Sequence, residues 1–195
     1  MIPKGQIRTW IDGYLNRQAD LIANLPGEEI ANLVELVRET YKLGNRIFAV
    51  GNGGNACNAS HFATDLGKGS SDAMETRFKV ISLNDNSGWM TAIGNDYSYD
   101  DVFRRQLENY GEPGDLLITS SVSGSSPNLL EAVKWASGNG LRTVAVVGAN
   151  RGNLADEVDL AVVIPDGHYG RVEDAQMTIY HLLCYAFMES APENG

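Results

Sequence analysis

The sequence predicts an α/β fold, namely a doubly wound, five-stranded parallel sheet that is flanked by helices and preceded by a helical extension. Two observations lead to this prediction. After Gly44, short and almost continuous apolar runs alternate with helical patterns, which is typical of strands buried on both faces of a parallel sheet. Before Gly44, apolar residues recur at helical spacing in two successive stretches. The repeated strand–helix order implies parallel strands joined by helical crossovers.

The individual elements follow from these patterns. The first helix ends at Pro26-Gly27, and the second runs from about Glu28 to Leu43 and stops at Gly44. The predicted strands are Arg46–Val50, Lys79–Leu83, Asp115–Thr119, Thr143–Val147 and Leu160–Ile164. The later predicted helices are Asn55–Leu66, Trp89–Ile93, Asp100–Asn109, Asn128–Asn139, Asn153–Asp156 and Arg171–Ser190. We expect one domain over 1–195, with helices over 1–44, an α/β core over 45–190 and a tail over 191–195.

The composition excludes several functional classes. The 195 residues carry a formal net charge of −10, which argues against a surface that binds nucleic acid or an anionic membrane. No apolar run approaches the length of a membrane span, and the N-terminus has no apolar signal region. The two cysteines, Cys57 and Cys184, form no disulfide framework, so we expect a reducing, cytoplasmic setting.

The most informative motif is the hydroxyl-rich segment Ser120–Asn128, which lies between the third predicted strand and a helix. Its backbone N–H groups, its serine hydroxyls and the positive end of the helix dipole converge on one point, which suits a phosphate. The segment contains no lysine or arginine, so neutral donors would hold that phosphate. This pattern favours a sugar phosphate over a nucleotide, which usually brings a different fingerprint.

A second loop, Gly51–Asn55, follows the first predicted strand. In open α/β sheets, ligands bind at the carboxyl ends of the strands, where this loop and the serine-rich segment both lie. The glycines allow a ligand to approach the backbone closely. Their spacing is not that of the dinucleotide-binding fingerprint, and a plain tight turn explains the loop as well.

Two of the three histidines lie near carboxylates at helical spacing. His61 and Asp65 are four residues apart and share a helix face, and Glu173 and His181 lie on nearly the same face of the last predicted helix. These four side chains would make a ligand set for a zinc-like ion, or they would transfer protons directly. A surface His–Asp pair and a hydrogen-bonded core histidine are the alternatives that spacing leaves open.

Together, these motifs resemble the sugar isomerase (SIS) domain family and, within it, the phosphoheptose isomerases. The resemblance covers nearly the whole chain. Besides the two N-terminal helices, it is carried by Gly51–Gly54, His61–Ala63, Gly94–Asp96, Ser121–Asn128 and Arg171–His181.

The resemblance implies the SIS fold and an aldose–ketose isomerase that acts on sedoheptulose 7-phosphate. Asp65 and His181 would be catalytic. The residues implied to bind substrate are Asn52, Gly53, Asn55, Asp96, Ser121, Ser123, Ser126 and Glu173. The residues implied to bind zinc or a similar divalent metal are His61, Asp65, Glu173 and His181. The resemblance also implies a homotetramer with the active site between subunits.

The chain departs from the family pattern at three positions. Asp65 replaces the usual glutamate, Glu173 replaces the usual glutamine, and Lys68 is the nearest substitute for an arginine. The aspartate is one methylene shorter, whereas Glu173 adds negative charge that would strengthen binding of a divalent ion. Two alternatives therefore stay open: a non-catalytic SIS module that binds a phosphosugar or a protein, and an isomerase of another sugar phosphate.

Overall fold

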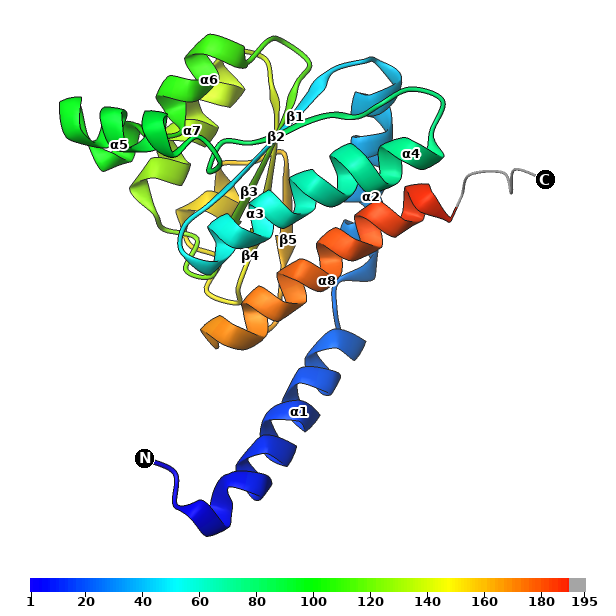
Figure 1. The fold of residues 1–195 in the computed structure, drawn as a ribbon, viewed down its shortest axis with the longest axis vertical. Helices are drawn as coiled ribbons and strands as arrows, with labels where there is room; N and C mark the ends of the chain where they lie inside the picture. Colours follow the sequence, from blue (N-terminus) through cyan, green and yellow to red (C-terminus); the bar gives the residue numbers. More distant parts are fainter. Residues whose placement is uncertain (190–195) are drawn as a thin grey trace.

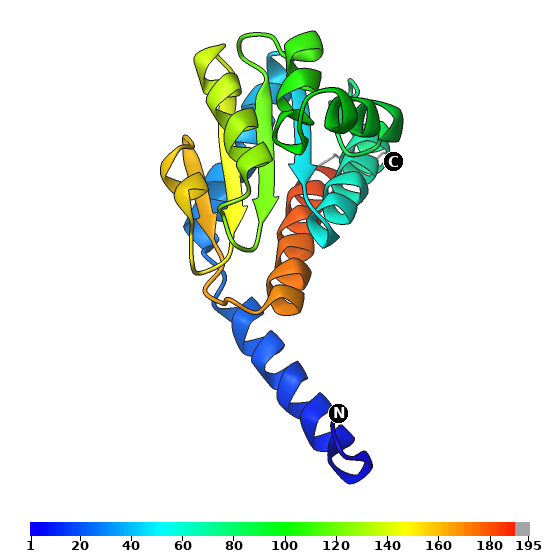
Figure 2. The same ribbon diagram turned by 90° about the vertical axis from the view of Figure 1, so that its left-hand side faces the viewer.

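The computed structural model describes residues 1–189, and the predicted tail over 191–195 lies outside them. Its centre is a five-stranded sheet with the strand order β2-β1-β3-β4-β5, in which every neighbouring pair is parallel. The strands are β1 (Arg46–Gly51), β2 (Lys79–Ser82), β3 (Leu116–Ser121), β4 (Arg142–Val147) and β5 (Leu160–Val163). Figure 2 shows that the strand arrows point to the same end of the molecule. The predicted parallel sheet is confirmed.

Helices cover both faces of the sheet (Figure 1). They are α1 (Ile7–Ala23), α2 (Gly27–Lys42), α3 (Gly54–Thr64), α4 (Ser71–Ala73), α5 (Ser87–Asp96), α6 (Arg104–Tyr110), α7 (Pro127–Gly138) and α8 (Tyr169–Met188). Three 3-10 turns are η1 (Lys4–Gln6), η3 (Tyr99–Asp101) and η4 (Asn153–Asp156), and a π-helical turn, η2 (Asp65–Ser70), follows α3. The predicted helix over Asn55–Leu66 therefore changes to π geometry at Asp65.

The core consists of two apolar layers, one on each face of the sheet. Successive strand side chains point to opposite faces, so Ile47 packs with α2, α3 and α8, whereas Phe48 packs with α6 and α7. Both side chains are almost fully buried. Burial on both faces explains why the inner strands β1, β3 and β4 are nearly continuous apolar runs.

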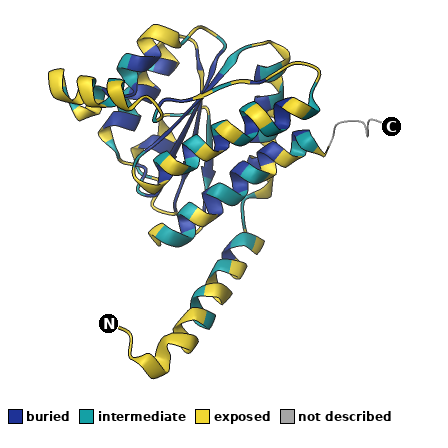
Figure 3. Cartoon of the chain, in the orientation of Figure 1, coloured by how far each residue is buried: buried dark blue, intermediate teal, exposed yellow. Residues whose placement is uncertain are grey.

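The helix α1 projects away from the sheet (Figures 1 and 2). Leu21 is its only buried residue, and Figure 3 shows most of its length exposed. Four large apolar side chains near its start are exposed: Ile7, Trp10, Ile11 and Leu15. Among the described residues, no helix is both long enough and apolar enough to span a membrane.

Candidate active site

A cavity of about 420 Å³ opens at the carboxyl ends of β1 and β3. It is lined by Asn52, Gly53, Gly54, Asn55, Ser120, Ser121, Val122, Ser123, Ser126, Tyr169 and Glu173. These residues come from the β1–α3 loop, the β3–α7 loop and the start of α8, which are far apart in the sequence. The cavity thus lies at the strand ends, where ligands bind in open α/β sheets.

The β1–α3 loop depends on two glycines. A Cβ on Gly51 would lie 2.6 Å from backbone atoms of Asn55, so a larger residue would push the loop away from α3. Gly53 has a φ of 57°, a backbone conformation that favours glycine. These glycines bring the start of α3 against the end of β1, which places Asn52 and Asn55 at the cavity.

The β3–α7 loop presents hydroxyl and N–H donors to the same cavity. The Oγ of Ser121 accepts a hydrogen bond of 3.0 Å from the N–H of Gly124, whose φ is 67°. Ser126 is the N-cap of α7, and its side chain makes no capping hydrogen bond. Pro127 has no N–H, and the N–H groups of Leu129 and Leu130 donate to the carbonyl oxygen of Ser126. In the first turn of α7, the N–H of Asn128 and the positive end of the helix dipole are therefore left for an anionic ligand.

Two cavity residues indicate what else a ligand must offer. Asn55 is only 5% exposed, and its Oδ1 has no hydrogen-bond partner. A buried acceptor of this kind needs a donor such as a sugar hydroxyl. A Cβ on Gly54 would lie 2.5 Å from Oε2 of Glu173, so this carboxylate lies against the N-terminal end of α3. The positive end of the helix dipole favours a carboxylate there.

A second group of titratable residues lies on the packed pair α3 and α8, which are neighbours in Figure 1. Nε2 of His61 is 3.2 Å from Oδ2 of Asp65, and Nε2 of His181 is 3.5 Å from the same oxygen. One ligand atom from each of these three residues lies within 4.8 Å of the others. The π-helical turn that begins at Asp65 is a feature often found at functional sites.

Within one protomer, two of the predicted positions lie apart from the groups in which they were expected. Glu173 does not join the group formed by His61, Asp65 and His181, because eight helical residues separate it from His181 by about 12 Å along α8. Instead, it lines the cavity. Asp96 does not line the cavity and is exposed at the end of α5, where its Oδ1 accepts a hydrogen bond from Asn95. The other predicted substrate residues line the cavity.

Several residues at the cavity were not predicted. Tyr169 and Ser120 line it, and Tyr99 reaches its wall with a 3.0 Å hydrogen bond from its hydroxyl to Oδ1 of Asn52. Ser120 belongs to the serine-rich motif, so its position could have been anticipated. Tyr169 and Tyr99 carry no sequence signal beyond their place at the start of a helix and in a short turn.

Three ionisable side chains near the site have shifted pKa values. Burial raises the pKa of Tyr180 to about 12, and its hydroxyl forms a hydrogen bond with Ser120. Burial, and then the negative charge of Asp65, raise the pKa of the Cys184 thiol to about 12. The ion pair of Asp166 with Arg171 lowers the pKa of the Asp166 carboxyl and supports the loop before α8.

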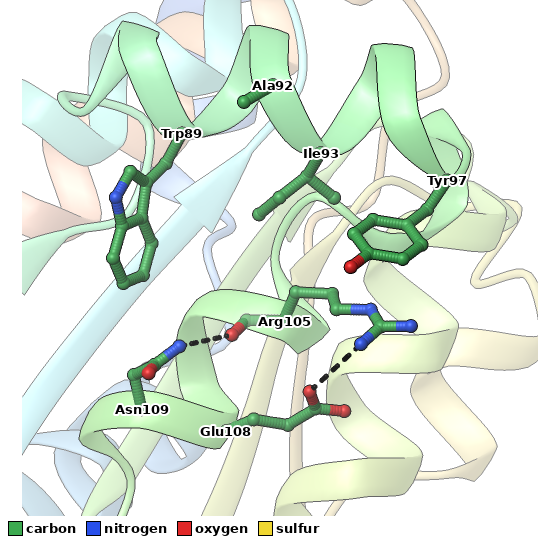
Figure 4. A pocket seen from close by; sticks show the side chains of 7 residues that line it. All are labelled: Trp89, Ala92, Ile93, Tyr97, Arg105, Glu108 and Asn109. Carbon is green, nitrogen blue, oxygen red and sulfur yellow. Dashed lines mark hydrogen bonds and ion pairs between the residues drawn. The ribbon is translucent and has the colours of Figure 1, made fainter.

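Another cavity, of about 300 Å³, lies between α5 and α6 (Figure 4). Trp89, Ile93 and Tyr97 of the α5 segment face Arg105 and Glu108 of α6. None of the predicted site residues lines this cavity, so we assign ligand binding to the cavity at the strand ends.

Comparison with known proteins places the chain in a family. A model of the SIS domain matches residues 10–148. The phosphoheptose isomerase of Citrifermentans bemidjiense is 33% identical over 177 residues, which cover 89% of this chain and 92% of that protein. That of Geobacter metallireducens is 38% identical over 157 residues, which cover 80% and 82% respectively. The structure of phosphoheptose isomerase from Neisseria gonorrhoeae has a TM-score of 0.86 at 26% identity and covers 94% of this chain and 99% of its own. The chain therefore belongs to the SIS domain family and, within it, to the phosphoheptose isomerases.

Proposed function

We propose that the chain is an aldose–ketose isomerase that converts sedoheptulose 7-phosphate into D-glycero-D-manno-heptose 7-phosphate. One observation carries the proposal: this chain belongs to the phosphoheptose isomerases and has a cavity at its strand ends that serine side chains line at the start of a helix. Phosphate binding by such neutral donors fits a sugar phosphate.

The substrate would lie with its phosphate on Ser121, Ser123 and Ser126. Its hydroxyls would supply the donor that Oδ1 of Asn55 lacks, and Asn52 would contact the substrate from the same wall. These contacts leave the carbonyl end of the sugar free to reach a catalytic acid and base.

Asp65 and His181 are the acid–base pair of the proposal. In the forward direction, the base removes a proton from C1 of the ketose while the oxygen on C2 is protonated, which gives an enediol. Addition of a proton to C2 and loss of the proton on O1 then yield the aldose. A well-placed acid or base contributes about 10² to 10⁴ in rate, so we expect Asp65→Asn to lower kcat by that range.

As the alternative to direct proton transfer by Asp65 and His181, we infer that His61, Asp65 and His181 bind zinc or a similar divalent ion. Two imidazoles and a carboxylate are ligands that zinc prefers, and their ligand atoms lie within 4.8 Å of one another. When bound, the ion would polarise the sugar carbonyl as a Lewis acid. Elemental analysis of protein purified without chelator tests this: about one ion per chain that Asp65→Asn loses would support it, and metal-free wild type would contradict it.

The activity test is incubation with sedoheptulose 7-phosphate in D₂O, followed by NMR of the sugar. The proposal predicts the aldose signal and deuterium at the carbon that receives the proton from the enediol. Asp65→Asn serves as the matched control, because the substitution removes the base with little change in size. Absence of both product and deuterium exchange in the metal-supplemented wild type would contradict the proposal.

We also propose that the enzyme is a homotetramer whose active sites lie between subunits. Within one protomer, the pair Asp65 and His181 lies about two helical turns from Glu173 in the cavity, a separation that supports completion of the cavity by the pair of another protomer. The exposed apolar side chains near the start of α1, such as Trp10 and Leu15, provide a surface for assembly.

A mixing experiment tests this arrangement. Asp65→Asn changes the catalytic pair, and Gly124→Ala displaces the phosphate loop of the cavity, two parts of the site that would meet only across an interface. If sites are shared, hybrids of these two impaired variants regain part of the activity, because some sites receive both an intact pair and an intact cavity. Hybrids that stay as inactive as their parents, although mass measurements show them to be mixed, would contradict a shared site.

We infer a cytoplasmic location for the enzyme. Both cysteines are unpaired, with Cys57 exposed and Cys184 buried, which fits a reducing compartment.

A further inference from the structure

We propose that Tyr99 is a positioning residue of the active site, which holds the side-chain amide of Asn52 so that one of its N–H groups faces the bound sugar phosphate. This proposal rests on the proposed function, which it deepens by adding a residue to substrate recognition. Tyr99 belongs to the 3-10 turn η3, which comes from neither loop that forms the cavity.

Three hydrogen bonds carry the proposal. The Tyr99 hydroxyl donates to Oδ1 of Asn52 at 3.0 Å, and Nδ2 of Asn128 donates to the same oxygen at 2.9 Å. In return, Nδ2 of Asn52 donates to Oδ1 of Asn128 at 2.9 Å. The Asn52 amide is therefore held from two sides.

These bonds determine what Asn52 offers to a ligand. A carboxamide oxygen accepts two hydrogen bonds, and both are used here by Tyr99 and Asn128. The carboxamide nitrogen donates two, and Asn128 takes one. Within residues 1–189 no hydrogen-bond partner takes the second N–H, and Asn52 lines the cavity. Asn52 thus presents a donor, which suits a phosphate or hydroxyl oxygen.

Tyr99 is needed because the Asn52–Asn128 pair alone does not determine this orientation. If both carboxamides turned over together, the pair would keep its two hydrogen bonds, but Asn52 would present its oxygen to the cavity. A lone pair there would repel a phosphate oxygen. The Tyr99 hydroxyl favours the observed orientation, because a phenol donates a hydrogen bond more readily than it accepts one.

The test compares Tyr99→Phe with wild type in the conversion of sedoheptulose 7-phosphate. Tyr99 is 57% exposed, so loss of its hydroxyl leaves core packing intact, and thermal unfolding checks this. We expect KM to rise about three- to tenfold, the usual value of one hydrogen bond, with kcat within about twofold of wild type. Tyr97→Phe is the matched control, because Tyr97 is also exposed but faces Arg105 in the α5–α6 cavity (Figure 4).

A double-mutant cycle with Asn52→Ala separates positioning from a general structural role. If Tyr99 acts through Asn52, Tyr99→Phe has no further effect on KM in the Asn52→Ala background. Equal effects in both backgrounds would overturn the proposal. An unchanged KM in Tyr99→Phe, or a fall in kcat alone, would overturn it as well.

Calorimetric binding of sedoheptulose 7-phosphate distinguishes this failure from that of the proposed function. If wild type binds the sugar without converting it, the isomerase proposal fails, and weaker binding by Tyr99→Phe still supports the role of Tyr99. If wild type neither binds nor converts the sugar, both proposals fail.

Discussion

Replacement of Gly124 by alanine tests whether the β3–α7 loop is the phosphate site. Gly124 has a φ of 67°, and its Cβ would lie 1.9 Å from the carbonyl oxygen of Arg151 in the next loop. Moreover, the Gly124 carbonyl accepts a 2.9 Å hydrogen bond from the N–H of Leu154. Because both contacts are to backbone atoms, no side-chain rotation relieves the clash, and the loop itself must move.

The structure gives the size of the effect. Ordinary contact begins at 3.4 Å, so the 1.9 Å separation requires a displacement of about 1.5 Å. The left-handed backbone conformation costs alanine about 1–2 kcal/mol in addition. A misplacement near 1 Å lowers the rate about a hundredfold, so we expect Gly124→Ala to lower kcat/KM by about that factor.

The assay is turnover of sedoheptulose 7-phosphate together with inhibition by inorganic phosphate. Gly138→Ala is the matched control, because a Cβ at Gly138 at the end of α7 meets no atom within 4 Å. We expect the control to keep wild-type kinetics. If folded Gly124→Ala kept its kcat/KM within threefold of wild type and bound phosphate equally well, the phosphate would not lie on this loop.

Two further predictions concern stability. The Arg171 guanidinium lowers the pKa of the Asp166 carboxyl, so the pair stabilises the fold above about pH 4 and loses its effect as the pH falls through the lowered pKa. The free energy of unfolding of Asp166→Asn should therefore be about 2 kcal/mol lower than that of wild type at pH 7. Urea titration should show a smaller difference at pH 3. An equal difference at both pH values would contradict a stabilising ion pair. Arg151 has a φ of 60°, so Arg151→Gly should raise the free energy of unfolding by about 0.5–1 kcal/mol, and a loss of stability would show that its side chain outweighs the strain.

The fold could be predicted because its signals are local. Burial on both faces makes the inner strands β1, β3 and β4 nearly continuous apolar runs, and Gly44 marks the end of α2. The ends of helices were harder to predict from the sequence where tertiary packing decides the backbone geometry. The helix predicted from Asp100 begins at Arg104, because a 3-10 turn over Tyr99–Asp101 precedes it.

The site was predictable where a motif lies on one loop and less so where distant elements meet. The serine-rich segment forms a wall of the cavity, because its carboxyl-end position follows from the sheet. Spacing suggested that Glu173 and His181 share a face of α8, but it could not show that two helical turns put them at different sites. No pattern could reveal that Tyr99 reaches Asn52, because that contact depends on the path of the chain after α5.

The negative charge of Glu173 should weaken the binding of phosphate in the cavity. Its carboxylate lines the cavity that we assign to a phosphate, so two like charges would share one space. A cavity of about 420 Å³ is about 9 Å across if it is spherical. At that distance, a single negative charge and a phosphate dianion repel each other by about 1 kcal/mol in water.

We therefore expect Glu173→Gln to bind inorganic phosphate about fivefold more tightly than wild type, as measured by competitive inhibition or calorimetry at low salt. The difference should shrink as salt is added, because exposed charges are screened. Asp174→Asn is the matched control, since it removes the same charge from the next residue of α8, which is exposed and does not line the cavity. Equal gains in both variants would assign the effect to net charge and would place the phosphate away from Glu173.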